Sequence, residues 1–196
     1  MTVIKQHNPI KLFKNWLDEA ENAEPNDANA MNLATVNAAG EPSSRMVLLK
    51  GVDQSGFTFY TNLGSRKAKD MSINPHVALC LHWKSLKRQV RIEGKIRPVG
   101  EKEADSYFKS RDRSSRIGAW ASKQSQVLSG RITLEKSVAE FTAKFQNKQV
   151  PRPKFWSGYK VFPMLIEFWV DKPSRLHERL VFYRVGDKWT TETLSP

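Results

Sequence analysis

The hydrophobic positions of the chain switch several times between helical and strand-like spacing. Near the N-terminus, Ile10 and Phe13 begin an apolar stripe with the interval of a helix. Asn8-Pro9 before them combines a capping residue with a proline in the first turn, which is typical of a helix start. The pattern therefore predicts an amphipathic helix that begins at residue 9 and is stopped by Pro25.

A strand-turn-strand pattern follows in the middle of the first half. Two apolar runs, Met46–Leu49 and Phe57–Tyr60, flank the turn-forming sequence Asp53-Gln54-Ser55-Gly56. This pattern predicts that the two runs pair with each other as a β-hairpin. A helix that has Ser65 as its N-cap is expected after the second strand.

Alternating or continuous apolar stretches predict the remaining strands, and helical periodicity predicts the remaining helices. The predicted strands cover residues 30–36, 77–83, 89–96, 158–161, 165–170, 175–185 and 188–194. Further helices are expected from residue 101 and over residues 131–146, the latter with an apolar stripe assigned to the core: Leu134, Val138, Phe141 and Phe145. Strands joined mostly in hairpins predict an antiparallel α+β fold, a small β-barrel with helices packed outside.

The composition is that of a globular protein. Of the 196 residues, 39% are hydrophobic, with six Trp and ten Phe, enough for one domain with a sizeable core. The sequence contains no apolar run of about 18 residues, and its N-terminus lacks the apolar core of a signal peptide. Cys80 is the single cysteine and lies in an apolar run, so we expect a buried thiol and a reducing, cytoplasmic compartment.

The net charge of +12 calls for an anionic partner, and nucleic acid, an anionic membrane or a phosphorylated small molecule would each qualify. The basic residues are scattered singly and form neither a block nor a repeated stripe, which disfavours nucleic acid. A generally basic surface that keeps the protein in solution accounts for most of them.

The start of the helix after Ser65 is a candidate phosphate site. Backbone N–H groups at a helix start favour an anion, and Ser65, Arg66 and Lys67 add a hydroxyl and two cations at that point. The glycine spacing of a P-loop is missing. A solvated helix start is the alternative.

A second candidate lies on the helix from residue 101. Tyr107, Arg111 and Ser115 are spaced four residues apart, so they share one face if the helix continues that far. A phenol, a guanidinium and a hydroxyl in a row can close around a phosphate. The alternative is an ordinary polar helix face.

A third candidate lies near the C-terminus. In the strand expected from residue 175, alternation places Arg175, His177 and Arg179 on one face. Three cationic or ionisable side chains in a row are costly unless a ligand or acids neutralise them. An exposed basic strand is the alternative.

Taken together, these motifs resemble those of the pyridoxine (pyridoxamine) 5′-phosphate oxidase family. The resemblance runs in order from about Ala30 to the end of the chain. It rests on the segments Arg45–Lys50, Tyr60–Lys67, Tyr107–Arg111 with Ser115, Ile117–Trp120, Lys123–Ser125, Ile166–Trp169 and Arg175–Arg179.

The resemblance implies an FMN-binding split β-barrel, a homodimer with FMN at the subunit interface, and oxidation of pyridoxine or pyridoxamine 5′-phosphate to pyridoxal 5′-phosphate by O2. The implied FMN contacts are Arg45, Met46, Val47, Leu48, Leu49, Lys50, Tyr60, Thr61, Ser65, Arg66, Lys67, Gln89, Gln124, Ser125, Trp169 and Arg179. The implied substrate contacts are Lys50, Tyr107, Arg111, Ser115, Arg175, Leu176 and His177. Arg175 and His177 are the candidate catalytic pair, with an orienting role at the pyridine ring. No metal site, nucleic acid or membrane partner is expected. A split barrel that binds FMN or pyridoxal 5′-phosphate without turnover is the alternative.

The sequence departs from the family pattern at a few places. The arm before Asn8 is short and lacks a basic, tyrosine-bearing segment, and Thr193 stands where an Arg is common. Asp27 is a weak candidate for the substrate ring. Arg45 and Lys50 are five residues apart, so an ideal strand would place them on opposite faces; a bulge, backbone contacts or two subunits would be needed to bring them to one site. We divide the chain into an N-terminal arm and helix, residues 1–29, and a split-barrel domain, residues 30–196.

Overall fold

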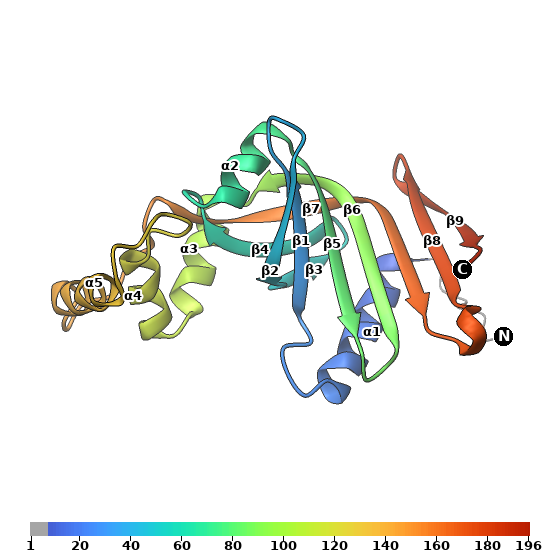
Figure 1. Ribbon diagram of the computed structural model, residues 1–196, viewed down its shortest axis with the longest axis horizontal. Coiled ribbons are helices and arrows are strands. Elements are labelled where there is room, and N and C mark those ends of the chain that lie inside the picture. The colour runs from blue at the N-terminus through green and yellow to red at the C-terminus, as the bar shows by residue number, and fades with distance from the viewer. Residues whose placement is uncertain (1–7) are drawn as a thin grey trace.

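The computed structural model describes residues 8–196, and the predicted N-terminal arm before Asn8 lies outside them. The described chain forms one antiparallel sheet that curls into a split half-barrel, with helices at its periphery (Figure 1). The strands are β1 (Ala30–Val36), β2 (Pro42–Leu48), β3 (Gly51–Asp53), β4 (Gly56–Asn62), β5 (His76–Trp83), β6 (Arg88–Pro98), β7 (Trp156–Val170), β8 (Glu178–Val185) and β9 (Lys188–Leu194). The helices are α1 (Pro9–Ala23), α2 (Arg66–Ile73), α3 (Glu101–Ser110), α4 (Arg113–Ala121), α5 (Arg131–Lys144) and the short 3₁₀ turn η1 (Pro173–Arg175). No described helix has the length and apolarity needed to cross a membrane.

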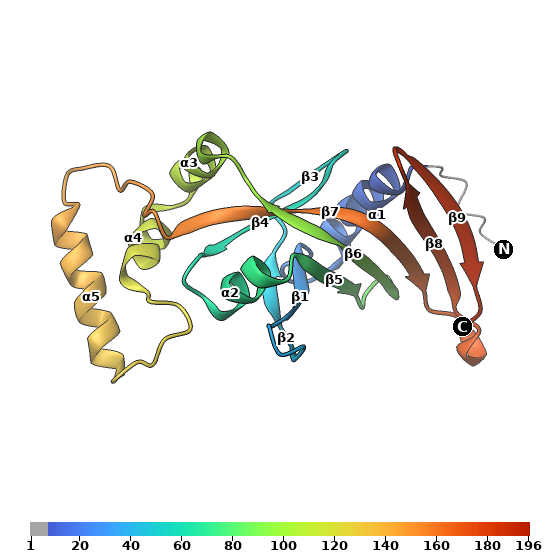
Figure 2. The ribbon, with the colours of Figure 1, turned by 90° about the horizontal axis from the view of Figure 1, so that it is seen from above.

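Strand β7 is the longest strand of the sheet, and it extends from β4 to the C-terminal hairpin of β8 and β9 (Figure 2). Its first half pairs with β4, its last half pairs with β8, and β6 runs beside both halves. We predicted two strands here, and that prediction is wrong because Pro163 does not interrupt the strand. Pro163 lies opposite Gly94 where the register of β6 shifts, a position that tolerates a residue without a backbone N–H. A side chain at Gly94 would place Cβ 2.2 Å from the Phe162 carbonyl oxygen, so only glycine fits there.

The predicted hairpin has the right turn but one wrong strand. β3 pairs with β4 around Asp53, whose carboxylate accepts hydrogen bonds from the backbone N–H groups of Ser55 and Gly56. The run from Met46 instead belongs to β2, which pairs with β1. The chain leaves the β1–β2 ladder after Leu48 and buries Leu49 in the core, so the two apolar runs cannot form one continuous hairpin.

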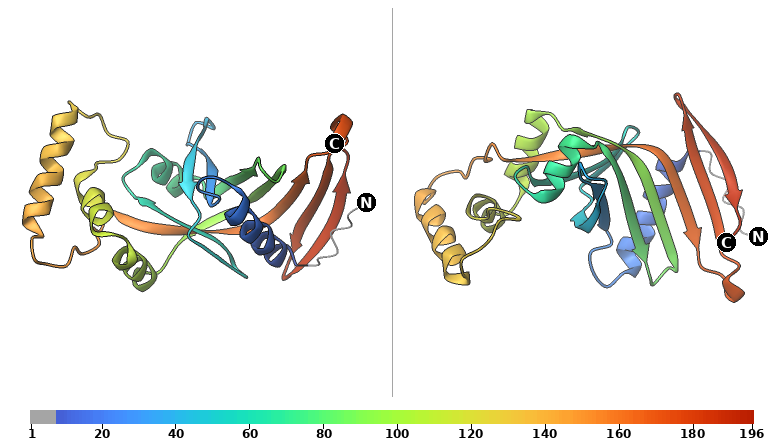
Figure 3. Two further views of the ribbon diagram at one scale, coloured as in Figure 1. Left: turned by 90° about the horizontal axis from the view of Figure 1, so that it is seen from below. Right: turned by 45° about the horizontal axis from the view of Figure 1, so that its top comes forward.

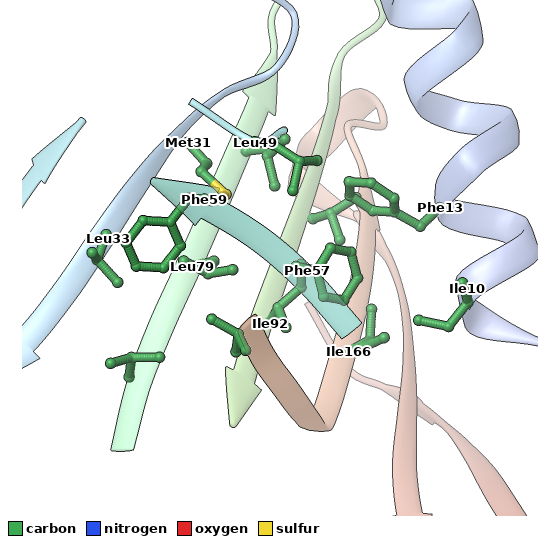
Figure 4. Close-up of a cluster of buried hydrophobic side chains, with 14 of the residues drawn as sticks. Ile10, Phe13, Met31, Leu33, Leu49, Phe57, Phe59, Leu79, Ile92 and Ile166 are labelled. Atoms are coloured by element: carbon green, nitrogen blue, oxygen red, sulfur yellow. The ribbon is translucent and has the colours of Figure 1, made fainter. Parts of the chain in front are cut away.

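The main hydrophobic core lies inside the curled sheet (Figure 4). Phe57 and Phe59 of β4 are fully buried, together with Ile92 of β6. Helix α1 seals this core with Ile10 and Phe13, and the Phe13 ring meets Phe57 edge to face at 4.9 Å between centroids. The predicted cap of α1 is confirmed, since Asn8 Oδ1 accepts hydrogen bonds from the first backbone N–H groups. Figure 3 shows α1 along the underside of the sheet.

The helices expected from residue 101 and over residues 131–146 are confirmed, but the first does not extend to Ser115 and the second has no core stripe. The helix from residue 101 ends at Ser110, because the Asp112 carboxylate caps a new helix by accepting from the Ser115 N–H. The stripe of α5 is not core, since no residue between 131 and 144 is buried and Val138 is exposed. Phe145, just after this helix, is buried in a smaller cluster with Phe108 and Trp156.

The C-terminal strand begins later than predicted. Arg175 ends the 3₁₀ turn, and His177 precedes β8, which starts at Glu178. Ser174 and Arg175 have φ of 58° and 61°, in the left-handed region that a strand cannot contain. Arg175, His177 and Arg179 therefore do not share one strand face.

Candidate functional site

The elements on one side of the sheet enclose a cavity of about 1060 Å³. Strands β2 and β4, the start of α2, helices α3 and α4, and the segment after α4 form its walls. We call it the cationic cavity. Among its lining residues are these residues proposed from the sequence: Arg45, Met46, Val47, Leu48, Lys50, Tyr60, Thr61, Arg66, Lys67, Tyr107, Arg111, Ser115, Gln124 and Ser125.

Lys67 is the most unusual charge of the cavity because it is almost fully buried, with 7% of its surface exposed. Its ammonium group donates only to neutral oxygens: Thr61 Oγ1 at 3.3 Å, Ser65 Oγ at 3.2 Å and Gln124 Oε1 at 3.2 Å. Burial, with a smaller contribution from the charge of Arg45, lowers the pKa of Lys67. A desolvated cation without a carboxylate partner is stabilised most by an anionic ligand.

Ser65 supports this lysine more than it supports the helix. It occupies the predicted N-cap position of α2, but its side chain makes no cap hydrogen bond. The buried hydroxyl faces the ammonium group of Lys67 instead, so the first backbone N–H groups of α2 receive no side-chain cap from Ser65. A helix start of this kind is suited to an anion.

Arg45 is held by a network that links three elements. Its Nη1 donates to Thr35 Oγ1 at 2.7 Å, and its Nη2 donates to Ser43 Oγ at 2.6 Å. Both hydroxyls also contact the buried Asp70, to which Thr35 donates at 2.7 Å, and Asp70 Oδ2 lies 3.8 Å from Arg45 Nη2. Burial lowers the pKa of Arg45 more than Asp70 raises it. Sequence reasoning missed Asp70, although its place one helical turn after Arg66 was a usable signal.

Arg45 and Lys50 can both face one cavity although they are five residues apart, because they do not lie in the same strand. Arg45 lies in β2, whereas Lys50 follows the break at Leu49 and begins the approach to β3. Both residues line the cavity because the chain changes direction between them. Leu49 itself is 4% exposed and belongs to the core, so its side chain is not on the cavity wall.

Stacked aromatic rings form another part of the cavity wall. The rings of Tyr60 and Tyr107 are parallel with centroids 3.8 Å apart, and Trp156 stacks on Tyr60 at 5.4 Å. Burial and the charge of Glu103 raise the pKa of Tyr60 to about 12, so its phenol stays neutral. Nothing in the sequence pattern marked Trp156 as a wall residue.

Arg111 lies between this wall and the start of α4. Its guanidinium carbon is 4.9 Å from the centroid of Trp156, a cation–π geometry. Its Nη1 is buried without a hydrogen-bond partner in the described chain, and burial lowers its pKa. Tyr107, Arg111 and Ser115 do line one cavity, but a break between two helices brings them there, not a single helix face.

Of the other proposed residues, Leu49 and Ser65 are buried and do not line the cavity. The rest lie in a region we call the C-terminal corner (residues 169–179 together with Gln89). Gln89, Trp169 and Arg179 are neighbours in register across β6, β7 and β8. His177 packs on the Trp169 ring with 4.7 Å between centroids. Arg175, Leu176 and His177 come from η1 and the residues after it, and 69% of Leu176 is exposed. Figure 1 shows β8 and α4 at opposite ends of the molecule, so one chain does not bring the two groups together.

Most charges in the C-terminal corner are paired within the chain, whereas Arg175 forms no ion pair with the described residues. Arg179 donates from Nε and Nη2 of its guanidinium to the two carboxylate oxygens of the buried Glu167, at 3.0 and 3.1 Å. Lys172 lies 3.3 Å from Glu178, and His177 Nδ1 lies 3.0 Å from Asp171 Oδ1. The weak candidate Asp27 is exposed, and so is Thr193, which stands where an Arg is common.

Comparisons with known proteins identify the family to which the chain is similar. A family model described as pyridoxamine 5′-phosphate oxidase matches residues 17–145, and one described as the pyridoxine 5′-phosphate oxidase C-terminal dimerisation region matches residues 156–196. A pyridoxine/pyridoxamine 5′-phosphate oxidase of Rhodospirillum rubrum is 54% identical over 201 residues, covering 100% of both chains.

Two solved structures are similar to the chain. PhzG from Burkholderia lata 383, crystallised with tetrahydrophenazine-1-carboxylic acid, superimposes with a TM-score of 0.93 at 33% identity, covering 98% of this chain and 95% of that one. A pyridoxamine 5′-phosphate oxidase-related, FMN-binding protein from Nostoc punctiforme has a TM-score of 0.77 at 15% identity, covering 96% and 98%, and supports the fold alone.

Proposed function

The chain belongs to the pyridoxamine 5′-phosphate oxidase family, and from this premise we propose that it is an FMN-dependent enzyme of vitamin B6 metabolism. It oxidises pyridoxine 5′-phosphate or pyridoxamine 5′-phosphate to pyridoxal 5′-phosphate with O2 as the acceptor. Hydrogen peroxide is the co-product, and the amine also consumes water and releases ammonia. The observation that carries the proposal is a single cavity that contains the buried Lys67 and the buried Nη1 of Arg111, neither of which has a carboxylate partner in the described chain.

The residues present fit the phosphate of FMN. Lys67, buried among neutral oxygens, and Arg66, beside it at the start of α2, provide charge and donors at one point. Arg45 adds a guanidinium that Asp70 and two hydroxyls keep in place. We assign these three cations to the cofactor phosphate, where each charge-assisted hydrogen bond contributes about 1.5–3 kcal/mol.

A second cluster in the cavity fits the phosphate of the substrate. Arg111 offers a buried Nη1 that has no partner in the described chain, and Tyr107 and Ser115 offer hydroxyls beside it. Lys50 adds an exposed cation that also lines the cavity. Two dianionic phosphates need two such clusters, because one cluster cannot neutralise both.

We further propose a homodimer in which the C-terminal corner of a second copy completes each site. The match of residues 156–196 to a dimerisation region supports this assembly. So does the distance between β8 and α4 along the molecule (Figure 1), because Arg175 and His177 cannot reach their own cavity. FMN then lies at the interface, with Gln89, Trp169 and Arg179 supplied by the second copy.

When bound, FMN supplies the two-electron acceptor that the side chains of the protein lack. The task of the protein is to bind both phosphates, to hold the reacting carbon of the substrate in place and to keep water out. Arg175 stacks on or donates to the pyridine ring, and His177 forms a hydrogen bond to one of its substituents. A reducing cytoplasmic location, expected from the lone Cys80, belongs to the same proposal.

Anaerobic mixing of the purified holoprotein with each vitamer tests the function. Pyridoxine 5′-phosphate or pyridoxamine 5′-phosphate should bleach the flavin absorbance, and admitted air should restore it with one peroxide per pyridoxal 5′-phosphate. Unphosphorylated pyridoxine is the matched control and should bleach far more slowly. A stable flavin spectrum with no peroxide would support the alternative of a binding protein without turnover.

Mixed dimers test the shared site. One chain carries Arg66→Ala with Lys67→Ala, the other carries Arg175→Ala with His177→Ala, and each homodimer should be nearly inactive. If each site takes residues from both copies, the mixed dimer keeps one intact site and regains about half of the wild-type turnover per dimer. No recovery in the mixed dimer would contradict the assignment of Arg175 and His177 to the second copy.

A further inference from the structure

His177 contacts two groups that place opposite demands on one nitrogen. Its Nδ1 accepts a hydrogen bond from the backbone N–H of Lys172 at 3.2 Å, and it also lies at an ion-pair distance of 3.0 Å from Asp171 Oδ1. The backbone N–H can only donate, so it requires Nδ1 without a proton, whereas the carboxylate can only accept and requires Nδ1 with one. The two contacts therefore correspond to two tautomers of the ring.

The structure shows the hydrogen bond from Lys172, but physical grounds lead us to expect that the carboxylate wins the competition for Nδ1. A hydrogen bond to an ionised acceptor is about twice as strong as one between neutral groups, and the shorter of the two distances is the one to Asp171. A carboxylate facing a lone pair at 3.0 Å would in addition be repelled. The partly exposed N–H of Lys172 loses little, because water can replace His177 as its acceptor.

We propose that Asp171 is a positioning residue for His177. Its carboxylate accepts the Nδ1 proton, holds the neutral ring in the Nδ1–H tautomer and leaves Nε2 as a hydrogen-bond acceptor for an O–H or N–H group of the substrate. Nε2 has no hydrogen-bond partner in residues 8–196, so it is available for that role. The inference deepens the proposed function and depends on it for the identity of the ligand.

The backbone around this pair indicates that its geometry is fixed. Ser174 and Arg175 are consecutive non-glycine residues with positive φ, a conformation that costs roughly 1 kcal/mol or more for each and persists only where the surroundings enforce it. The Leu176 N–H donates to the Pro173 carbonyl at 3.2 Å, and Lys172 and Glu178 form an ion pair across the turn. The Trp169 ring packs against the imidazole from β7. The hydrogen bond within the turn, the ion pair across it and the Trp169 ring together constrain His177.

The direct test is nitrogen NMR of the flavin-loaded holoprotein with labelled histidine. The chain has four histidines, and the signals lost in His177→Gln identify the ring in question. In the wild type, at a pH where the ring is neutral, Nδ1 should have the shift of a protonated nitrogen and Nε2 that of an acceptor. In Asp171→Asn, the side-chain amide can donate to Nδ1, so the two shifts should exchange.

Steady-state kinetics provides the second readout. Asp171→Asn should lower kcat by roughly 10-fold to 100-fold, the loss of one charge-assisted hydrogen bond, with FMN content unchanged. Asp171→Glu keeps the carboxylate and should recover part of the activity. Asp187→Asn, the same change on a fully exposed side chain in the β8–β9 turn, is the matched control and should alter neither readout.

Two results would overturn the proposal: a wild-type His177 with its proton on Nε2, or shifts that do not change in Asp171→Asn. Failure of the proposed function would look different. In that case the wild type itself would not turn over either vitamer, while the NMR experiment would still decide whether Asp171 sets the tautomer.

Discussion

The cationic cavity and the C-terminal corner contain the same kinds of side chain and treat them in opposite ways. In the cavity, Lys67 is buried and Arg111 is half-buried with its Nη1 shielded from solvent, and neither has a carboxylate partner in the described chain. In the C-terminal corner, Nε and Nη2 of Arg179 donate to the Glu167 carboxylate, and His177 lies beside Asp171. Both regions are rich in positive charge, but the cavity leaves Lys67 and Nη1 of Arg111 without a carboxylate partner in the described chain, even though its Arg45 is paired with Asp70.

The difference separates two uses of a cation. A buried cation that has no acid beside it raises the free energy of the folded protein until an anion binds, so it marks a binding site. A cation that a carboxylate already neutralises is held in a fixed place, and it serves structure or orientation. Substitutions should therefore have opposite effects on stability in the two regions.

The largest expected effect is the loss of FMN affinity in Arg66→Ala with Lys67→Ala. Two charge-assisted hydrogen-bonding groups are removed, so the dissociation constant should rise by roughly 100-fold to 10,000-fold. Quenching of flavin fluorescence by the apoprotein measures it. Lys69→Ala, on the exposed side of the same helix, is the control and should change the affinity less than about threefold. Equal FMN affinity of the double variant and the wild type would contradict a phosphate at the start of α2.

The next effect is on stability in the C-terminal corner. Glu167→Gln leaves Arg179 without its carboxylate in a place where Glu167 is only 4% exposed, so the free energy of unfolding should fall by roughly 2–3 kcal/mol. Urea denaturation of the apoprotein measures this. Glu93→Gln, which removes a carboxylate that pairs with Arg91 but is 47% exposed, should cost less than about 0.5 kcal/mol. Similar losses in the two variants would mean that burial does not determine how much these ion pairs contribute to the free energy of unfolding.

The smallest effect has the opposite sign and belongs to the cavity. Lys67→Gln keeps a donor for the surrounding oxygens but removes the desolvated charge, so the apoprotein should gain about 1 kcal/mol. The gain should depend on pH. Because the folded protein lowers the pKa of Lys67 below that of the unfolded chain, the charge costs stability at neutral pH. This cost begins to fall as pH rises through the lowered pKa and is gone above the pKa of the unfolded chain. The advantage of the variant over the wild type should therefore shrink in alkaline solution, and a variant less stable at pH 7 would contradict the account.

Local sequence signals predicted most elements but not how they continue or pair. The strand over residues 30–36 and the cap at Asn8 follow from spacing and residue type, and both are confirmed. The continuity of β7 could not be predicted, because the position of Pro163 depends on a glycine in a different strand. The break before α4 was detectable in principle, since Asp112 three residues before Ser115 is a cap signal.

The sequence was sufficient to predict most of the residues that line the cavity, but not the contacts that hold them in place. The motif residues on β2, β4, α2, α3 and α4 do line one cavity. The pattern did not reveal that Asp70 anchors Arg45 or that Trp156 completes the aromatic wall, because these contacts join segments far apart in the sequence. Alternation placed Arg175 and His177 in a strand, whereas two left-handed residues at Ser174 and Arg175 turn the chain before β8 starts.

The central claim is that the unneutralised cations of the cavity recognise a phosphate. The most direct measurement compares FMN with riboflavin, which lacks only the phosphate, in titrations of the apoprotein and of Lys67→Gln. The account predicts that the wild type binds FMN at least about 100-fold more tightly than riboflavin, and that the variant loses most of this preference through weaker FMN binding, with riboflavin affinity little changed. Equal affinities of the wild type for the two flavins, or an unchanged preference in Lys67→Gln, would contradict it.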